Sequence, residues 1–385
     1  MTGTVSVRVL LIWRFSHHAS YFRALATQSS LEMVPFSKED LPAITLADLA
    51  WLWQADIANL AATHIDRLTF GRHNRLRPLR ALRRVMHSVF AALACARFHR
   101  AFLRQRPDAI AVWNGGHWFF QAAIRAAREF AIPVFYCENG LLPDTTTFDP
   151  RGINYHNAVP RAAAFYRALA PMPPLTRTSL VARKPVRGCS AQPLTLPRRY
   201  LFVPLQMNRD TQIVFNSPWI RDMYQLLQVL RTVIERVGDA ELSIVVKEHP
   251  SCTFRYDDQR TTLGPRFLFA NGNSTQELID GAEAVITVNS TVGLEALLRE
   301  RRVIVIGSAF YAIDELVLRA GNEDELVTAI DALVDWQPDT GLRHQFLGWL
   351  ETVYCIPGSW RAPDAAHCRR IEQRLENVVE RGLAL

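Results

Sequence analysis

The chain has 385 residues, of which 49% are hydrophobic and 21% charged, values typical of a folded protein with a substantial core. This composition excludes disordered, collagen-like and coiled-coil proteins, and no apolar run reaches the roughly 18–20 residues needed to span a bilayer. The net charge of +7 is modest, and the six cysteines are far apart, which favours a reducing, cytoplasmic compartment over a zinc site or disulfides.

The first half of the chain alternates short apolar segments with helical ones. The apolar N-terminus lacks a basic leader and a small-residue cleavage site, so we expect a first strand rather than a signal peptide. The predicted strands are 5–13, 109–114 and 132–137, and the predicted helices are 44–62, 76–104 and 118–130. A long loop is expected after the third strand, to about residue 155.

The second half repeats this alternation after a Pro-, Arg-, Ser- and Thr-rich stretch at 171–197. The predicted strands are 199–205, 241–247, 282–288 and 302–307, the predicted helices are 218–237, 274–281 and 292–300, and a last helix is expected at 364–381. This pattern predicts an α/β protein with two Rossmann-like domains that face each other across a cleft, where the carboxyl ends of the strands bind ligands.

The domain boundaries follow from the same pattern. We expect a first domain at 1–175, a linker at 176–197 and a second domain at 198–360. The segment 361–385 is expected to be a C-terminal helix that could pack back on the first domain.

The charge is unevenly distributed along the chain. Between Asp66 and Asp108 there is no acidic residue but there are eleven arginines, including Arg80, Arg83 and Arg84, and apolar residues recur at helical spacing. A basic amphipathic helix can lie on an anionic membrane surface, whereas a helix packed into the domain would only present a solvated basic face. Nucleic acid is not expected as a partner, because no nucleic-acid-binding module accompanies the arginines.

Polar residues follow the predicted strand 282–288. Asn289, Ser290 and Thr291 lead into a helix, and hydroxyls with free N–H groups at a helix N-terminus suit a phosphate, although ordinary capping is the alternative for Ser290 and Thr291. Glu295 lacks the three-residue spacing of a capping box, so a nucleotide ribose is a candidate partner.

Two other strands of the second half end in polar residues. Lys247 and His249 follow the strand at 241–247, and Pro250 favours an extended residue before it, which would project His249 beyond the strand. Gln206 and Asp210 lie in a loop after the strand at 199–205, where an aspartate is also a common turn former or cap.

The strand ends of the first half carry a second polar group. Glu138 and Asn139 directly follow the strand at 132–137. A general acid or base at this strand end would face the cleft. Asn114 ends another strand without forming a G-x-G-x-x-G fingerprint. The remaining candidates follow the first strand and are Ser16, His17, His18, Tyr21 and Arg23. We expect the adjacent histidines to point in different directions, so a metal pair is not expected.

These segments together resemble the bacterial capsule polysaccharide biosynthesis family of retaining β-Kdo transferases, which build a Kdo linker on a lipid anchor. The shared motifs, in chain order, are S-H-H-x-x-Y-F-R, W-N-G, E-N-G-x-L-P with a following G-I-N, Q-x-x-x-D, H-P and T-V-N-S-T-V-G-L-E-A-L. The single two-domain module is most similar to the member that adds the first Kdo. The extending members have E-D-G where this chain has Glu138-Asn139-Gly140.

The resemblance implies a GT-B-like fold, CMP-β-Kdo as donor and phosphatidylglycerol, or its lyso form, as acceptor. It implies that His249, Ser290, Thr291 and Glu295 hold the CMP, that Asp210 is the nucleophile and that Glu138 is a candidate acid or base. Gln206, Lys247 and Asn289 complete the expected donor side, with no cofactor and no metal. The implied location is the inner face of the cytoplasmic membrane, where other capsule assembly proteins could be partners.

Two other classes of function remain open on the residues alone. The chain could be another GT-B-type sugar transferase or a nucleotide-sugar 2-epimerase, since these also place His and Glu against a nucleotide. It could instead be a non-catalytic component of capsule assembly or export.

Overall fold

The protein is described here by a computed structural model that covers residues 7–54, 77–180, 192–207, 211–252 and 256–381. The chain divides into two compact units, which we describe separately. The first unit comprises residues 1–159 and 353–385, and the second comprises residues 160–352.

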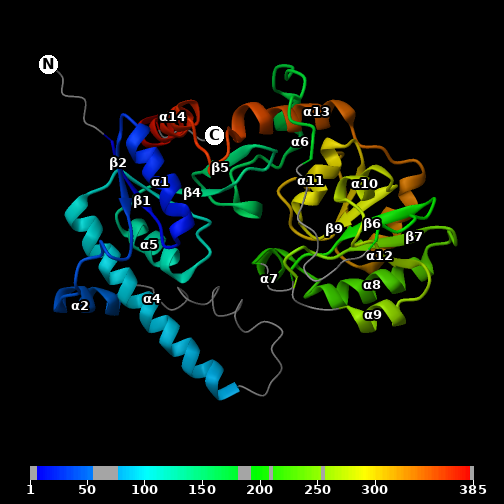
Figure 1. Cartoon of the computed structure of the whole chain (residues 1–385), viewed down its shortest axis with the longest axis horizontal. Coiled ribbons are helices and arrows are strands. Elements are labelled where there is room, and N and C mark those ends of the chain that lie inside the picture. Colours follow the sequence, from blue (N-terminus) through cyan, green and yellow to red (C-terminus); the bar gives the residue numbers. More distant parts are fainter. Residues whose placement is uncertain (1–6, 55–76, 181–191, 208–210, 253–255, 382–385) are drawn as a thin grey trace. The chain divides into compact units, whose positions relative to one another are not determined.

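A six-stranded sheet forms the centre of the first unit (Figure 1). In chain order its described strands are β1 (Arg8–Ile12), β2 (Glu32–Phe36), β3 (Ala109–Trp113), β4 (Val134–Asn139), β5 (Thr145–Asp149) and β12 (Ile356–Pro357). The spatial order is β12-β5-β4-β3-β1-β2, with β1–β4 parallel and with β5 and β12 antiparallel to their neighbours. The order in which successive strands are added to the sheet reverses between β1 and β3, and open α/β sheets bind ligands at such a point.

The helices of this unit pack on the sheet or, in the case of α2, on α4. They are α1 (Ser16–Gln28), α2 (Leu46–Gln54), α4 (Arg77–Gln105), α5 (Trp118–Glu129) and α14 (Ala365–Arg381), with a short 3₁₀ turn at Asn154–His156. The α5 helix begins where the side chain of His117 accepts a hydrogen bond from the backbone N–H of Phe119. Glu372 of α14 accepts hydrogen bonds from the backbone N–H groups of Ser30 and Leu31, so the C-terminal helix is held against the turn that follows α1.

The second unit contains a fully parallel sheet. Its described strands are β6 (Tyr200–Pro204), β7 (Ser243–Lys247), β8 (Phe267–Phe269), β9 (Ala284–Thr287), β10 (Arg302–Val305) and β11 (Leu318–Arg319). The spatial order is β11-β10-β9-β6-β7-β8, which is the doubly wound Rossmann order. The reversal lies between β6 and β9, so the crevice beyond the carboxyl ends of these two strands is the expected ligand position.

The described helices of the second unit have between 5 and 14 residues. They are α6 (Ala163–Arg167), α7 (Thr211–Asn216), α8 (Met223–Arg236), α9 (Asp257–Thr262), α10 (Thr275–Asp280), α11 (Thr291–Leu298), α12 (Glu323–Asp331) and α13 (Thr340–Trp349), with a 3₁₀ turn at Ala332–Val334. A π-helical turn, Leu350–Tyr354, leads back into the first unit. Asp222 caps α8 by accepting from the N–H of Gln225 at 2.8 Å, which fixes the start of the longest described helix of this unit.

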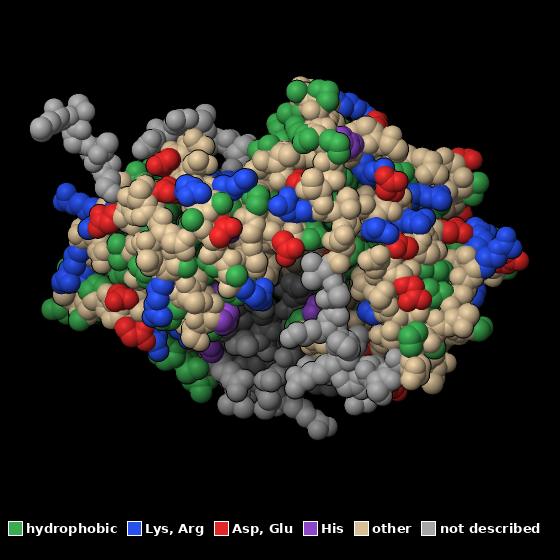
Figure 2. Space-filling view, turned by 45° about the horizontal axis from the view of Figure 1, so that its top comes forward, with side chains coloured by type: hydrophobic (Ala, Val, Ile, Leu, Met, Phe, Trp, Pro, Cys, Tyr) green, Lys and Arg blue, Asp and Glu red, His purple; other side chains and the backbone are tan. Residues whose placement is uncertain are grey.

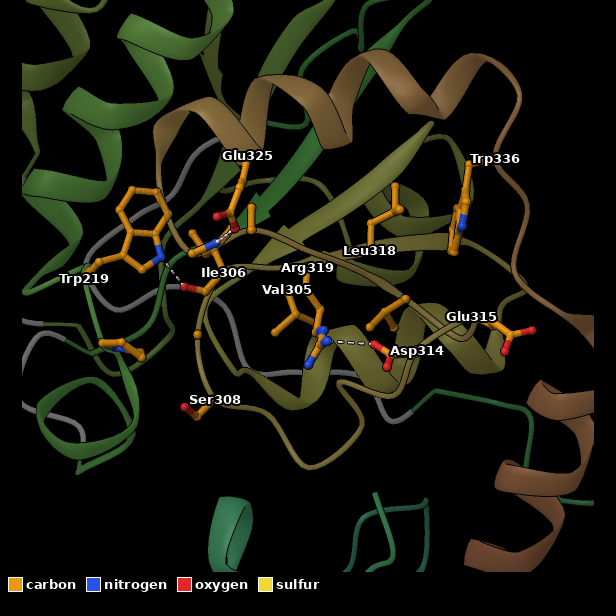
Figure 3. Close-up of a pocket in the computed structure, with 15 residues that line it drawn as sticks. Trp219, Val305, Ile306, Ser308, Asp314, Glu315, Leu318, Arg319, Glu325 and Trp336 are labelled. Carbon is orange, nitrogen blue, oxygen red and sulfur yellow. Dashed lines mark hydrogen bonds and ion pairs between the residues drawn. The ribbon is translucent and has the colours of Figure 1, made fainter. Parts of the chain in front are cut away.

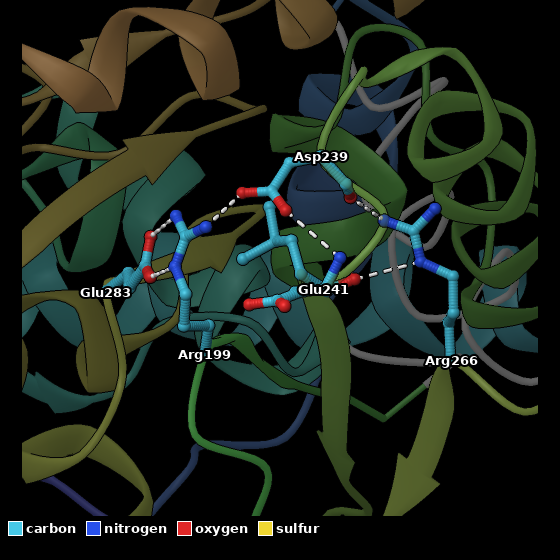
Figure 4. A network of polar contacts seen from close by, with 6 residues as sticks. Arg199, Asp239, Glu241, Arg266 and Glu283 are labelled. Atoms are coloured by element: carbon cyan, nitrogen blue, oxygen red, sulfur yellow. Dashed lines mark hydrogen bonds and ion pairs between the residues drawn. The ribbon is translucent and has the colours of Figure 1, made fainter.

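Charged side chains close the amino ends of the second sheet, opposite the expected ligand position (Figure 4). Arg199 forms ion pairs with Glu283 at 2.5 Å and with Asp239. Arg266 donates to the backbone carbonyls of Leu242 at 2.9 Å and Asp239 at 2.6 Å. Burial alone would raise the pKa of Asp239, but the N–H of Glu241 and the Arg199 guanidinium hold that pKa below its usual value.

The prediction of two Rossmann-like α/β domains is confirmed, while several elements differ from expectation. The expected long loop after β4 is wrong, because residues 145–149 return as antiparallel β5. Gly140 permits this tight hairpin, since a Cβ there would lie 1.8 Å from the side-chain oxygen of Thr145. The α1 helix and the strands β2, β8, β11 and β12 were not expected.

The boundary between the units lies at Val159–Pro160, earlier than the expected end of the first domain at 175. Tyr166 packs edge to face against Phe346 at 5.3 Å between ring centroids, and Thr176 and Arg177 both hydrogen-bond to Glu351. These contacts attach the start of the expected linker to the second unit. Within the described residues, no helix is long and apolar enough to cross a membrane.

Candidate functional site

The carboxyl ends of β6 and β9 are tied together by two side chains. The amide nitrogen of Gln206, directly after β6, donates to the side-chain oxygen of Asn289 at 2.9 Å, and the backbone N–H of Asn289 donates back to Gln206 Oε1 at 3.3 Å. Asn289 Nδ2 also donates to the backbone carbonyls of Gln212 and Asn216 at 3.1 and 3.0 Å. The two residues that the sequence placed after separate strands therefore meet at the point where the strand order reverses.

The N-terminus of α11 lies beside this pair. Ser290 is the N-cap: its hydroxyl accepts from the N–H of Val292 at 3.2 Å, which is the capping role that the sequence left open. The Ser290 O–H can still donate to a ligand, and the next side chain, Thr291, is exposed. The hydroxyl of Tyr311 donates to the backbone carbonyl of Ser290, and this hydrogen bond holds the turn that precedes α11.

Gly293 makes room for that tyrosine. A Cβ at this position would lie 2.4 Å from the Tyr311 hydroxyl oxygen, and Tyr311 is fully buried. Glu295 follows in α11 and is half-buried. Burial first, and the negative charge of Glu295 second, raise the pKa of Tyr311.

Lys247 and His249 lie at the end of the neighbouring strand β7. The Lys247 ammonium donates to the backbone carbonyls of Asn271, at 3.2 Å, and Asn273. These bonds hold the loop after β8, and the positive charge stays at this edge of the sheet. The Nδ1 of His249 accepts from the N–H of Ser251 at 3.1 Å, so the neutral ring carries its proton on Nε2.

We call this cluster the second-unit edge: Gln206, Lys247, His249, Asn289, Ser290, Thr291 and Glu295, at the ends of β6, β7 and β9. The structure places six of the seven predicted donor-side residues at three neighbouring strand ends, and Glu295 in the α11 helix that follows β9. Asp210, the predicted nucleophile, lies outside the described residues.

A cavity of about 580 Å³ lies next to this edge, at the ends of β10 and β11 (Figure 3). Gly307, in its wall, packs against Val288, the residue before Asn289. The charged lining residues are Asp314, Glu315, Arg319 and Glu325, and Arg319 is paired with Asp314 at 2.7 Å. This acidic lining disfavours a phosphate, which leaves the N-terminus of α11 as the better position for an anion.

The first unit has its own cluster at the ends of β1, β3 and β4. Asn114, in the left-handed backbone region with φ 62°, donates through Nδ2 to Glu138 Oε2 at 2.5 Å. The backbone N–H and the side chain of Asn139 donate to the other oxygen of Glu138, at 2.8 and 2.9 Å. These three donors orient the carboxylate of Glu138 at the end of β4.

The two histidines at the start of α1 differ in environment. Their rings lie edge to face with centroids 4.0 Å apart, so the expectation that they point in different directions is wrong. His17 is exposed, whereas His18 is 6% exposed and stacks on Trp113 at 4.2 Å. Burial first, then the charges of His17 and Arg361, lower the pKa of His18 to about 4.

Tyr21 does not line this site, contrary to expectation, because it is 1% exposed and lies in the core. Its hydroxyl bonds to His367 Nε2 at 2.9 Å, while His367 Nδ1 faces the carbonyl of Pro357. Tyr21 therefore supports the helix that carries His18. Arg23 is exposed, with its guanidinium carbon 5.6 Å from the centre of the Trp13 ring.

Sequence reasoning missed two residues that complete this cluster. The indole N–H of Trp360 donates to Asn139 Oδ1 at 2.8 Å, and the ring lies 5.6 Å from His18. Arg361 lies over the Trp360 ring at 4.3 Å. Both come from the segment after β12, and no signal in their local sequence links them to residues more than 200 positions earlier.

The structure places the remaining candidates as follows. Arg84 is exposed on α4, and the side chains of Arg80 and Arg83 lie outside the described part of the chain. Among the residues that the structure describes, no three His, Cys, Asp or Glu side chains are grouped so that they could hold a metal ion.

Comparison with known proteins supports a link to capsule biosynthesis. A model of the family "Capsule polysaccharide biosynthesis protein" matches residues 187–325, which include every residue of the second-unit edge. The chain is 38% identical to protein FixF of Sinorhizobium fredii over 267 residues, or 68% of this chain and 63% of FixF. It is 30% identical to the capsule polysaccharide export protein KpsS of Escherichia coli over 163 residues, or 40% of each chain. The chain thus spans less than two thirds of the length of either relative.

One solved structure with a similar course of the chain is KpsC of Thermosulfurimonas dismutans, a β-Kdo 2,4 transferase. The similarity covers 69% of this chain and 88% of that chain, with 18% sequence identity and a TM-score of 0.44.

Proposed function

We propose that the protein is a glycosyltransferase that transfers Kdo from CMP-β-Kdo to a phosphatidylglycerol acceptor, or its lyso form, with retention of the anomeric configuration. The observation that carries the proposal is the coincidence of the family match with the second-unit edge. The same stretch that is similar to capsule biosynthesis proteins forms a polar cluster at the reversal point of a Rossmann sheet.

The charges at this edge suit an anionic donor. The donor carries a phosphate and the carboxylate of Kdo, and the N–H groups of α11 with the Ser290 hydroxyl supply donors for one of them. The Lys247 ammonium adds positive potential, and His249 can donate through Nε2. Glu295, one turn into α11, is proposed to accept from the ribose hydroxyls.

Retention requires two displacements at the anomeric carbon. In the first, a carboxylate oxygen of Asp210 attacks that carbon, and the bond to the CMP phosphate oxygen breaks with its electron pair leaving on CMP. In the second, the acceptor hydroxyl loses its proton to a base and displaces the Asp210 carboxylate. Glu138 is the proposed base, which requires that it reach the acceptor hydroxyl when both substrates are bound.

The test is an incubation with CMP-Kdo and a fluorescent phosphatidylglycerol analogue, with mass analysis of the lipid. We expect addition of one Kdo by the wild type, and no transfer but continued CMP binding by Asp210→Ala. The matched control is Asp331→Ala, an exposed aspartate on α12, which should transfer normally. Transfer by Asp210→Ala at the wild-type rate would exclude the double displacement on this residue.

Similarity to KpsS, a capsule polysaccharide export protein, favours a second candidate, a non-catalytic component of capsule export. Thermal-shift measurements with CMP, CMP-Kdo, UDP-N-acetylhexosamine and CDP-glycerol separate the two. Stabilisation by CMP compounds with turnover supports the transferase. A uridylate preference indicates another sugar transferase or an epimerase, and absence of any nucleotide effect favours the export component.

A further inference from the structure

The N-terminal half of α4 carries large apolar side chains that its own unit does not cover. Leu82, Val85, Met86, Val89 and Phe90 are between 43% and 65% exposed. From Ala91 onward the same helix contributes buried residues to the core, including Cys95, Phe98 and Phe102. In Figure 1 this helix, drawn in cyan, continues well past the sheet of its unit.

The five apolar positions fall on one side of the helix. At about 100° per residue they occupy an arc of about 140°. Positions 80, 83, 84 and 87 fall on the opposite arc, where the sequence has three arginines and a histidine. A helix with one apolar face and arginines on the opposite face is typical of helices that lie in the interface of a membrane.

The charge of this region is also one-sided. No Asp or Glu occurs between Asp66 and Asp108, whereas basic and acidic side chains are interspersed over the face shown in Figure 2. An apolar stripe accompanied only by positive charge is complementary to a bilayer surface, which combines an apolar interior with anionic headgroups. A second copy of the helix would cover the apolar stripe but leave the arginines on the outer side unused, whereas an anionic bilayer would engage both the stripe and the arginines.

We propose that residues 82–90 of α4, with the neighbouring arginines, dock on the surface of an anionic lipid bilayer. The apolar side chains enter the boundary between headgroups and acyl chains, and the arginines remain at the phosphates. This inference goes beyond the transfer reaction and does not need it, because docking requires neither donor nor acceptor.

The experiment is co-sedimentation of the full chain with vesicles of phosphatidylcholine alone or mixed with phosphatidylglycerol. We expect binding to the mixed vesicles only, decreasing with added salt. The double variant Val85→Asp/Val89→Asp should lose binding. The control is Val334→Asp in the second unit, an equally apolar side chain that is 81% exposed and should leave binding unchanged.

The charge contribution is measured separately. A basic side chain near an anionic surface changes vesicle affinity about fivefold, so replacing Arg80, Arg83 and Arg84 together by Gln should weaken binding about a hundredfold. Transfer of Kdo to a water-soluble acceptor analogue by these variants should stay at the wild-type rate, which separates failure of docking from failure of the proposed reaction.

Three results would overturn the inference. Equal binding of wild type and Val85→Asp/Val89→Asp to mixed vesicles would show that the stripe does not enter the lipid. A large loss of thermal stability in that variant, with no change for Val334→Asp, would show that the stripe is covered by the protein's own chain. A wild-type dimer that the variant converts to monomer would show that a second copy covers it.

Discussion

The burial of His18 makes a quantitative prediction about acid stability. The ring is 6% exposed and stacked on Trp113, and its pKa falls from the ordinary 6.5 to about 4. The folded protein therefore favours the neutral ring, while the unfolded chain takes up a proton below pH 6.5. The contribution of His18 to stability is complete above that pH and decreases as the pH falls toward 4.

The difference of about 2.5 between the two pKa values corresponds to about 3 kcal/mol of lost stability once the pH is below 4. About 2 kcal/mol of this loss should be present at about pH 5. Replacing His18 by Phe keeps an aromatic ring against Trp113 and removes the titration. The variant should therefore lose less stability than the wild type between about pH 7.5 and pH 5.

Urea denaturation followed by tryptophan fluorescence measures this difference at each pH. The pKa of His367 is also lowered by burial, but its effect is common to both proteins and cancels in the comparison. His156→Phe, at an exposed ring of the same unit, serves as the control and should follow the wild type. Parallel loss of stability by wild type and His18→Phe would refute the reasoning, since the buried ring would then titrate normally.

Two further predictions concern the second-unit edge. Gly293→Ala places a methyl group 2.4 Å from the Tyr311 hydroxyl and should lower the free energy of unfolding, measured by urea denaturation, by about 1–3 kcal/mol. Gly238→Ala, where a Cβ meets no atom within 4 Å, should lower it by less than about 1 kcal/mol. Equal losses in the two variants would show that Tyr311 moves aside without cost. Asn289→Leu leaves the Gln206 amide without its hydrogen-bond partner, so it should lower the free energy of unfolding by about 1–3 kcal/mol and weaken CMP binding. Unchanged CMP affinity in calorimetry would show that the Gln206–Asn289 pair does not contribute to the CMP site.

The strands that the sequence predicted well are those with continuous apolar runs. The segments at 199–205, 241–247 and 282–288 became β6, β7 and β9 with their ends shifted by one or two residues, because strands buried on both faces are apolar throughout. The strand β5 was missed because its residues, Thr145–Asp149, contain no apolar run and directly follow the turn residues Pro143 and Asp144, and it pairs antiparallel beside β4. The two- and three-residue strands β11 and β8 are too short to form a pattern.

The candidate residues of the second-unit edge could be predicted because they follow strand ends, and parallel strands end at one edge. Their mutual contacts could not be predicted. The reciprocal bonds of Gln206 and Asn289 depend on the strand order, and the strand order depends on packing between elements about 80 residues apart. The carbonyls that engage Lys247 belong to a loop with no distinguishing motif.

The first-unit cluster was predicted less completely for a related reason. Glu138 and Asn114 were found at strand ends, and the structure joins them directly. Trp360 and Arg361 reach the same cluster only because the chain returns to the first unit after the second is complete. Helical periodicity predicted the apolar stripe of α4, but only the packing of α4 decides that this stripe is exposed, while Ala91, Cys95, Phe98 and Phe102 of the same helix are buried.

The most direct test of the central claim is calorimetric titration of CMP into the wild type, His249→Ala and Asp331→Ala. Binding of CMP at the second-unit edge predicts clear affinity in the wild type and in Asp331→Ala, and a loss of at least tenfold in His249→Ala, or about 1.4 kcal/mol. Equal affinity in all three proteins, or a preference for UMP over CMP, would contradict the claim that this edge holds a cytidylate donor.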